Sequence, residues 1–253
     1  MEVHAHTHSS GKKWTHYFWE FLMLFLAVFC GFLAEYQLEH KIEKDREKQF
    51  MKSLLVDLEK DSASLAYNIE KGPSIVQYSD SLTSELKKRP LQGREKRIYR
   101  FLALISDGIN FRYNDRTVSQ LRNSGGFRLV TKLEVSNAVL DYDVLMREAQ
   151  SYVGSNESWS FLQPAIIKSA TIFDIDLVFK IQEDVLKYFN QPDSVHFPEE
   201  PRLIIYDETA IRQFNSMQRY AQLTDQVKLY YSNKAFEQNR VLNSLIRKEY
   251  HLK

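Results

Sequence analysis

The residues of this chain best suited to binding a metal ion are histidines near its N-terminus. His4, His6 and His8 alternate in the stretch HAHTH, and His16 follows. Neutral imidazoles at this spacing bind zinc, copper or nickel. A tail without neighbouring groups to orient the rings binds such ions weakly and with little selectivity. Two interpretations therefore stay open, metal handling by the tail and a polar tail without a metal.

Two carboxylates in the stretch FDID are the next candidates, because paired acids serve many hydrolases. Asp174 and Asp176 stand two positions apart at the expected start of a helix. Acids at a helix N-terminus cap its free N–H groups and interact favourably with its dipole. The capping interpretation is therefore favoured, and a membrane-tethered hydrolase is kept as an alternative.

The remaining motifs lack parts that their chemistry needs. Ser124-Gly125-Gly126 has no following lysine and serine or threonine, as a phosphate-binding loop requires. Ser158 and Ser160 have none of the glycines of a nucleophile elbow. Four aromatic residues could line a ligand pocket, although aromatic side chains of helical proteins mostly fill the core: Trp159, Phe161, Tyr230 and Tyr231. We therefore expect neither a catalytic site nor a cofactor.

Composition excludes several classes of protein. The 253 residues include 34 basic and 33 acidic ones, whereas a nucleic-acid binder usually has a basic excess. The single cysteine, Cys30, permits no intrachain disulfide and no zinc site built on several cysteines.

The most distinctive segment is FLMLFLAVFCGFLA, from Phe21 to Ala34, which carries no charge. Aromatic residues on both sides extend it to residues 17–36, about twenty positions or roughly 30 Å of helix, enough to cross a bilayer. Tyr17, Trp19 and Tyr36 stand where an interfacial aromatic belt is expected. We therefore predict a transmembrane helix at 17–36, after a short polar tail at 1–16.

A cleaved signal peptide and a buried core helix are the alternatives to this span. Cleavage after Ala34 would place Phe32 at a position that requires a small residue. A helix that is apolar all round and is followed by a strongly polar stretch is typical of an anchor. Charge counting does not orient it, because Lys12 and Lys13 precede it and four basic residues follow it: Lys41, Lys44, Arg46 and Lys48.

Residues 37–253 are predicted to form an all-α domain that begins with a stalk helix. Apolar residues recur mostly at four-residue steps from Phe50 to Ile69, with Asp61 interrupting the stripe, and Gly72-Pro73 predicts the end of this helix near Lys71. Further helices are expected at 75–88, 96–107, 115–123, 134–154 and 174–190, and after the N-cap Asp207. The run 203–206 permits one short strand, which does not imply a sheet. A helical bundle follows.

A basic stretch, KKRPLQGREKRIYR at 87–100, holds seven Lys or Arg residues and one Glu. It can be a patch for anionic lipid or another acidic partner. A solvated loop followed by the start of a helix is the favoured interpretation.

Three stretches resemble a known family: 50–61 (FMKSLLVDLEKD), 117–130 (TVSQLRNSGGFRLV) with the following Leu140-Asp141-Tyr142, and 241–249 (VLNSLIRKE). With the apolar segment and the charged helix after it, they are similar to an uncharacterised family of single-pass membrane proteins from Gram-negative bacteria. The resemblance implies an anchor in the inner membrane and a C-terminal domain in the periplasm. It implies no activity, and the histidine tail and the segment around Trp159 depart from the family pattern.

These features together predict a membrane-anchored helical interaction or sensing module that is not an enzyme. Its expected partners are the lipid bilayer and a protein of the cell envelope, and no nucleic acid.

Overall fold

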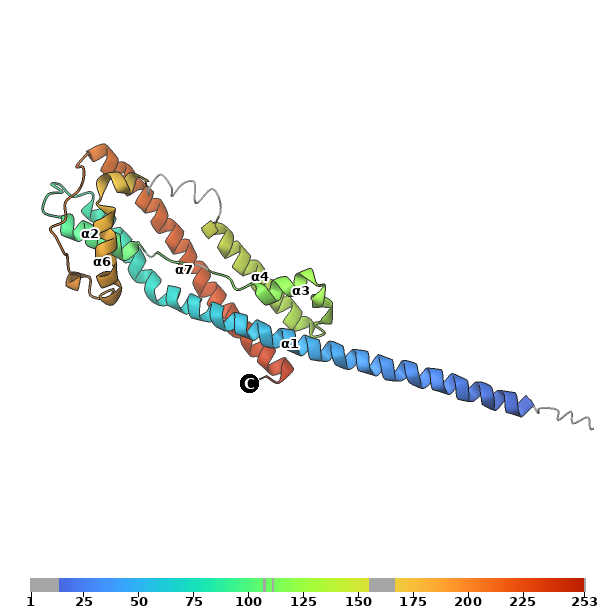
Figure 1. Ribbon diagram of the computed structural model, residues 1–253. Coiled ribbons are helices and arrows are strands. Elements are labelled where there is room, and N and C mark those ends of the chain that lie inside the picture. The colour runs from blue at the N-terminus through green and yellow to red at the C-terminus, as the bar shows by residue number, and fades with distance from the viewer. Residues whose placement is uncertain (1–13, 107, 111, 155–166, 253) are drawn as a thin grey trace, which may run out of the picture. The chain divides into compact units, whose positions relative to one another are not determined.

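The computed structural model describes residues 14–106, 108–110, 112–154 and 167–252. The chain divides into two compact units, an N-terminal unit (Met1–Gln49) and a helical unit (Phe50–Lys253). Every regular element in the described residues is helical, which confirms the predicted all-α class (Figure 1). The elements are α1 (Trp14–Glu85), α2 (Glu95–Ile105), α3 (Arg116–Asn123), α4 (Leu133–Gly154), α6 (Ile175–Lys187), α7 (Glu208–Tyr250) and the 3-10 turns η1 (Gly126–Leu129) and η2 (Pro192–Ser194).

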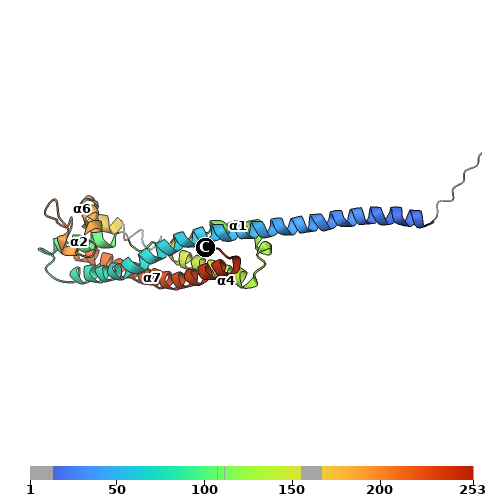
Figure 2. The ribbon, with the colours of Figure 1, turned by 90° about the horizontal axis from the view of Figure 1, so that it is seen from below.

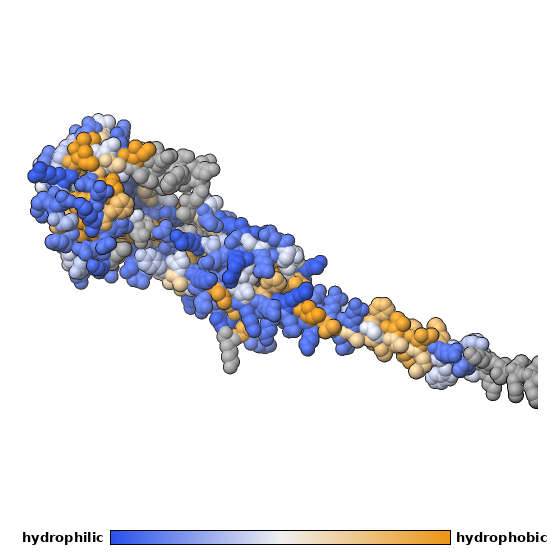
Figure 3. Space-filling model, in the orientation of Figure 1, coloured by the Kyte–Doolittle hydropathy of each residue, from blue (hydrophilic) through white to orange (hydrophobic). Residues whose placement is uncertain are grey.

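The described part of the N-terminal unit is the first portion of α1. Its apolar side chains from Phe21 to Leu33 are almost all exposed. Figure 3 shows hydrophobic surface along this part of the helix on the face in view. By length and composition, this part of α1 is able to cross a membrane. The predicted span therefore coincides with a part of α1 that buries almost none of its apolar surface.

The helical unit is organised around α1 from Phe50 onward and α7, which run beside each other in both ribbon views (Figures 1 and 2). Side-chain hydrogen bonds join the two helices. The amide of Asn68 donates to Ser232 Oγ at 3.2 Å, and that of Gln222 donates to the carbonyl of Val76 at 3.2 Å. Helix α4 packs on α7, and α2 packs on α6.

Two separate hydrophobic clusters form the core of this unit. The first cluster joins α1 near Met51 and Leu58 to α3, α4 and the last turns of α7, with Tyr142 fully buried. The second cluster joins α1 near Leu82 to α2, α6 and the first turns of α7. In the second cluster the ring of Phe173 meets those of Tyr99 and Phe214 at centroid distances of 5.8 and 5.0 Å.

The predicted helix end at Gly72-Pro73 is wrong, because α1 continues through both residues to Glu85. A proline inside a helix removes one hydrogen bond and costs about 3 kcal/mol or more. Buried residues on both sides of it, Leu65 and Ile75, hold the helix together by tertiary packing. Gly72 serves close packing, since a Cβ there would lie 2.9 Å from Leu229 Cδ1 and 3.0 Å from Ile109 Cδ1.

The other predicted boundaries are close to the observed ones, except that the helix expected at 75–88 is the last part of α1, which ends at Glu85. Gly125 follows α3 with a φ of 66°, a left-handed conformation that favours glycine, so the predicted turn is present. The run 203–206 contains no strand. A backbone hydrogen bond runs from the N–H of Ile204 to the carbonyl of Ile172 at 2.8 Å.

Candidate functional site

The predicted metal ligands His4, His6 and His8 lie outside the described residues. His16 is described, and it pairs with Glu20 at 3.1 Å in the next turn of α1. Among the described residues, no group of three or more His, Cys, Asp or Glu side chains is placed to hold a metal ion. The geometry therefore adds nothing to the metal interpretation of the tail.

Asp174 and Asp176 belong to the start of α6, as the capping interpretation predicted. Asp174 is the N-cap, and its carboxylate accepts a hydrogen bond from the N–H of Leu177 at 3.1 Å. Asp176 lies in the first turn of the helix. Neither residue lines any of the described cavities. The pair that motivated the hydrolase alternative is thus accounted for by helix capping.

Of the four aromatic residues considered for a ligand pocket, Tyr230 and Tyr231 lie in the described residues, and their rings meet edge to face at a centroid distance of 5.5 Å. Trp159 and Phe161 lie outside the described residues, as do Ser158 and Ser160. Tyr231 packs against the first cluster, whereas Tyr230 is exposed on the surface of α7.

The basic stretch 87–100 is largely neutralised by acids of the same chain. Buried Glu85 pairs with Lys88 at 2.7 Å, with Arg94 at 2.8 Å and with Arg97 at 3.7 Å. Burial would raise the pKa of Glu85, but the hydrogen bonds and charges of these cations outweigh it and lower the pKa below its ordinary value. Three further pairs in the stretch are Arg89–Glu208, Lys96–Glu200 and Arg100–Asp193. These contacts support a structural role for the stretch rather than an anionic-lipid patch.

The most elaborate polar arrangement of the described residues was not predicted from the sequence: a network of three buried aspartates around the first cluster. Asp57, Asp61 and Asp143 are at most 2 % exposed. Asp57 and Asp61 are one turn apart on α1, and Asp143 is on α4. The signal was present in the sequence, because Asp57 and Asp61 fall among the buried positions Leu54, Leu58 and Leu65.

Asp57 caps a helix that is distant in the sequence. Its carboxylate accepts hydrogen bonds from the backbone N–H of Thr117 at 3.0 Å, from the Thr117 hydroxyl and from Arg116 Nη2 at 3.0 Å. Arg116 and Thr117 form the first turn of α3, where the helix dipole favours a negative charge. The local N-cap residue, Asp115, makes no capping bond with its side chain. Asp57 therefore supplies the cap that the local sequence does not.

Asp61 lies at the centre of the network. It accepts hydrogen bonds from the backbone N–H and side-chain amide of Asn114, at 2.9 and 2.7 Å, and from the Tyr142 hydroxyl at 3.0 Å. Asn239 of α7 donates to the same hydroxyl at 3.1 Å and to the carbonyl of Leu58 at 2.9 Å. One connected set of bonds therefore joins α1, the segment before α3, α4 and α7.

Asp143 completes the network with cationic partners. It accepts from the Tyr113 hydroxyl at 2.9 Å and from Arg147 Nε at 3.0 and 3.1 Å, and it also pairs with Arg122. Burial, together with the nearby carboxylate, raises the pKa of Tyr113, so its hydroxyl remains a donor. This part of the network joins α3 to α4.

The electrostatics distinguish Asp61 from its two neighbours. Asp57 and Asp143 have arginine partners, whereas the donors to Asp61 among the described residues are an amide, a backbone N–H and a phenol. Burial raises the pKa of Asp61 above its ordinary value, against the lowering effect of these hydrogen bonds. The carboxylates are buried and already hydrogen-bonded, and none lines a described cavity. The network therefore fixes the positions of helices.

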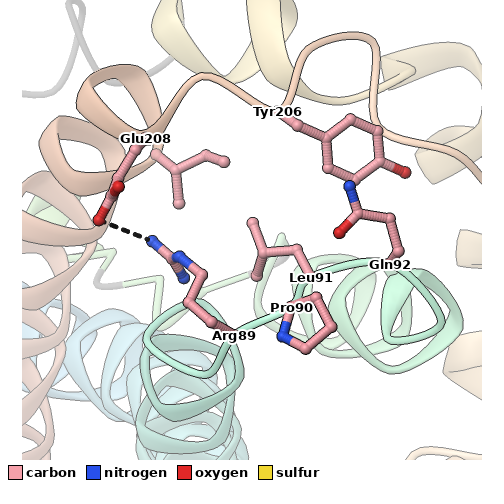
Figure 4. Close-up of a pocket in the computed structure, with 7 residues that line it drawn as sticks. Arg89, Pro90, Leu91, Gln92, Tyr206 and Glu208 are labelled. Atoms are coloured by element: carbon pink, nitrogen blue, oxygen red, sulfur yellow. Dashed lines mark ion pairs between the residues drawn. The ribbon is translucent and has the colours of Figure 1, made fainter.

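One surface cavity of about 470 Å³ lies over the second cluster, between the loop that follows α1 and the start of α7 (Figure 4). Pro90, Leu91 and Ile211 supply apolar surface, and Arg89 faces Glu208 across it at 3.7 Å. This cavity is open, and its two opposite charges face each other. It has no arrangement of a nucleophile and a base.

Comparisons with models of protein families, with curated proteins and with solved structures found no match to this chain. Its class is therefore defined by its fold: an all-α protein in which one helix is long and apolar enough to cross a membrane.

Proposed function

We propose that this protein is a single-pass membrane protein whose helical domain, residues 37–253, is a non-enzymatic interaction or sensing module. Residues 17–36 anchor it, and its partner is a protein or small ligand of the cell envelope. The observation that carries the proposal is the apolar part of α1, whose side chains are exposed. In water such a surface would be strongly unfavourable, whereas in a bilayer it is solvated by lipid.

The proposed site of the domain is the periplasmic side of the inner membrane. The charges flanking residues 17–36 favour neither orientation, so this placement depends on the family resemblance. It is tested by a reporter that is active only outside the cytoplasm, attached after Lys253. We expect an active reporter. An inactive one would place the domain in the cytoplasm and change the set of partners.

Anchoring itself is tested by alkaline carbonate extraction of membranes containing the full chain. We expect the protein to stay in the membrane pellet, and a double substitution within the span, Leu24→Lys and Phe29→Lys, to release it, because each lysine costs about 2.5–3.5 kcal/mol near the centre of a span. Matched substitutions in the polar stretch, Gln37→Lys and Gln49→Lys, should leave it in the pellet. Release of the unmodified protein would contradict the proposed anchor.

The interaction role is tested by photo-cross-linking in intact cells, with a photoreactive residue at exposed positions of the helical unit. We expect one face to give a discrete adduct with an envelope component and the other faces to give none. A folded, membrane-bound protein without adducts on any face would count against an interaction module.

A further inference from the structure

The open cavity between the loop that follows α1 and the start of α7 combines two opposite charges with an uncharged wall (Figure 4). At one end, the guanidinium of Arg89 faces the carboxylate of Glu208. The rest of the lining consists of Pro90, Leu91, Gln92, Tyr206 and Ile211. Its volume of about 470 Å³ is within the range of sites that bind small molecules. The cavity is therefore suited to a molecule that carries both charges and an apolar part.

Arg89 is held in position by the backbone that precedes it. Its Nη1 donates hydrogen bonds to the carbonyl of Leu86 at 2.9 Å and to that of Lys88 at 3.0 Å. Its Nη2 lies 3.7 Å from Glu208 Oε1, across the cavity. A guanidinium that is already positioned binds a carboxylate well, because its planar N–H groups match the carboxylate oxygens.

The two charges of the cavity are only loosely paired with each other. Their separation of 3.7 Å is longer than a hydrogen bond. The side chains of Arg89 and Glu208 are 43 and 65 % exposed, and such surface pairs contribute little to stability. Glu208 also pairs with Arg212 at 3.4 Å. A ligand can therefore separate Arg89 from Glu208 at a small cost in free energy.

The uncharged side of the cavity is built on packed residues. Leu91 and Ile211 belong to the second cluster and are 4 and 1 % exposed. The Tyr206 hydroxyl donates to Glu95 Oε1 at 2.6 Å, which positions the ring on the side of the cavity away from Glu208. A wall that is formed before the ligand arrives saves the cost of ordering it on binding.

We propose that this cavity binds a free α-amino acid with an apolar side chain. An α-amino acid carries its ammonium and its carboxylate on one carbon atom, so its two charges are close together, as those of Arg89 and Glu208 are. The carboxylate binds Arg89, the ammonium binds Glu208, and the side chain covers Tyr206 and Pro90. A ligand with a carboxylate alone would be repelled by Glu208, and one with an ammonium alone by Arg89. This inference rests on the proposed sensing role and names a ligand class for it.

The first test compares ligands and needs no substitution. Leucine, isocaproate and leucinamide are titrated into the full chain in detergent, and binding is followed by ligand-observed NMR, with detergent alone as the background. Isocaproate lacks the ammonium of leucine, and leucinamide lacks its carboxylate. We expect leucine to bind about tenfold more tightly than either analogue, since each analogue loses one charge-assisted contact. Equal binding of the three, or no binding of leucine, would overturn the proposal.

The second test locates the site on the chain. Arg89→Gln and Glu208→Gln should each weaken leucine binding by about tenfold. The matched controls are Lys96→Gln and Glu200→Gln, which remove an exposed ion pair that does not line the cavity. Leucine binding should be unchanged in both controls. Equal losses in the cavity variants and in the controls would overturn the site.

Glu208→Gln keeps this test independent of folding. Arg89 also bonds to the loop backbone, so its substitution can loosen the loop, whereas the described contacts of the Glu208 carboxylate are ion pairs at the surface. The circular dichroism spectrum and thermal unfolding of Glu208→Gln should equal those of Glu200→Gln. A folded Glu208→Gln chain that binds leucine as tightly as the unmodified chain would overturn the role of the charge pair.

Failure of this site is distinguishable from failure of the proposed function. Binding is measured on the purified chain, so the result does not depend on the anchor or on its orientation. If leucine does not bind while photo-cross-linking in cells gives an adduct with an envelope component, the amino-acid site is overturned and the interaction module stands.

Discussion

Asp61 in the first cluster and Glu85 in the second are both buried acids of α1, but their carboxylates meet different kinds of partner. In the first cluster Asp61 is surrounded by neutral donors, Asn114 and Tyr142. In the second, Glu85 meets three cations whose side chains reach the surface. The shifts in pKa are therefore opposite in sign: the pKa of Asp61 is raised, and that of Glu85 is lowered.

The clusters also differ in what joins their helices. Hydrogen bonds that the carboxylates of Asp57 and Asp61 accept and that the amide of Asn239 donates link the elements of the first cluster. The second depends more on aromatic packing around Phe173. Polar networks fix one arrangement because each bond has a direction, whereas apolar packing gives most of its stability through area and volume. We therefore expect the first cluster to be sensitive to hydrogen-bond loss and the second to loss of volume.

The largest effect is expected from Phe173→Ala in the second cluster. Phe173 is fully buried, and truncating a buried phenylalanine costs about 3–5 kcal/mol in transfer and cavity terms. Urea unfolding of the full chain in detergent, followed by tyrosine and tryptophan fluorescence, measures the loss. Phe179→Ala on α6, the helix that begins just after Phe173, is the control, because Phe179 is 62 % exposed and should change stability by about 0.5 kcal/mol or less. Equal effects of the two substitutions would show that the second cluster is not the packed core described.

A smaller loss is expected from Asp57→Ala in the first cluster. It removes the cap of α3 and leaves the N–H and hydroxyl of Thr117 without their acceptor, which costs about 1–3 kcal/mol. The same unfolding experiment measures it, and hydrogen exchange should show faster opening of α3. The control is Asp115→Ala, which removes the local N-cap side chain without removing a capping bond. A larger loss for Asp115→Ala would mean that the local residue caps the helix.

The sequence predicted the helices well because their apolar period and their caps are local signals. Asp174 and Asp207 accept from Leu177 and Ala210, three residues on, so both caps could be recognised without the fold. The end at Gly72-Pro73 was also a local signal, but packing of Gly72 against Leu229 and Ile109 overrides it. Those contacts come from distant parts of the chain, and a local pattern contains no information about them.

The buried network was missed for the same physical reason. Asp61 interrupts an apolar stripe, and from sequence alone such a residue indicates a break in burial rather than a bonded acid. Its donors lie 53 and 81 positions away along the chain, at Asn114 and Tyr142. Two acids one turn apart on the buried face of a helix are the signal that could have identified it. The identity of the donors still required the structure.

The smallest expected effect is a difference in acid response between Asp61→Asn and Glu85→Gln. The folded-state pKa of Asp61 lies above its ordinary value of 3.8, so its contribution to stability rises as the pH falls through that raised pKa. The folded-state pKa of Glu85 lies below 4.5, so its contribution to stability is complete above that pH and is lost as the pH falls further.

Relative to the unmodified protein, Asp61→Asn should therefore lose stability on going from pH 7 to pH 4. The loss of stability caused by Glu85→Gln should instead be smallest at the lowest pH. Its total effect is modest because the partners of Glu85 are partly exposed to solvent. Thermal unfolding of the three proteins at intervals between pH 3 and 7 measures both slopes. If the two variants shift the profile in the same direction, the contrast between neutral and cationic neutralisation does not hold.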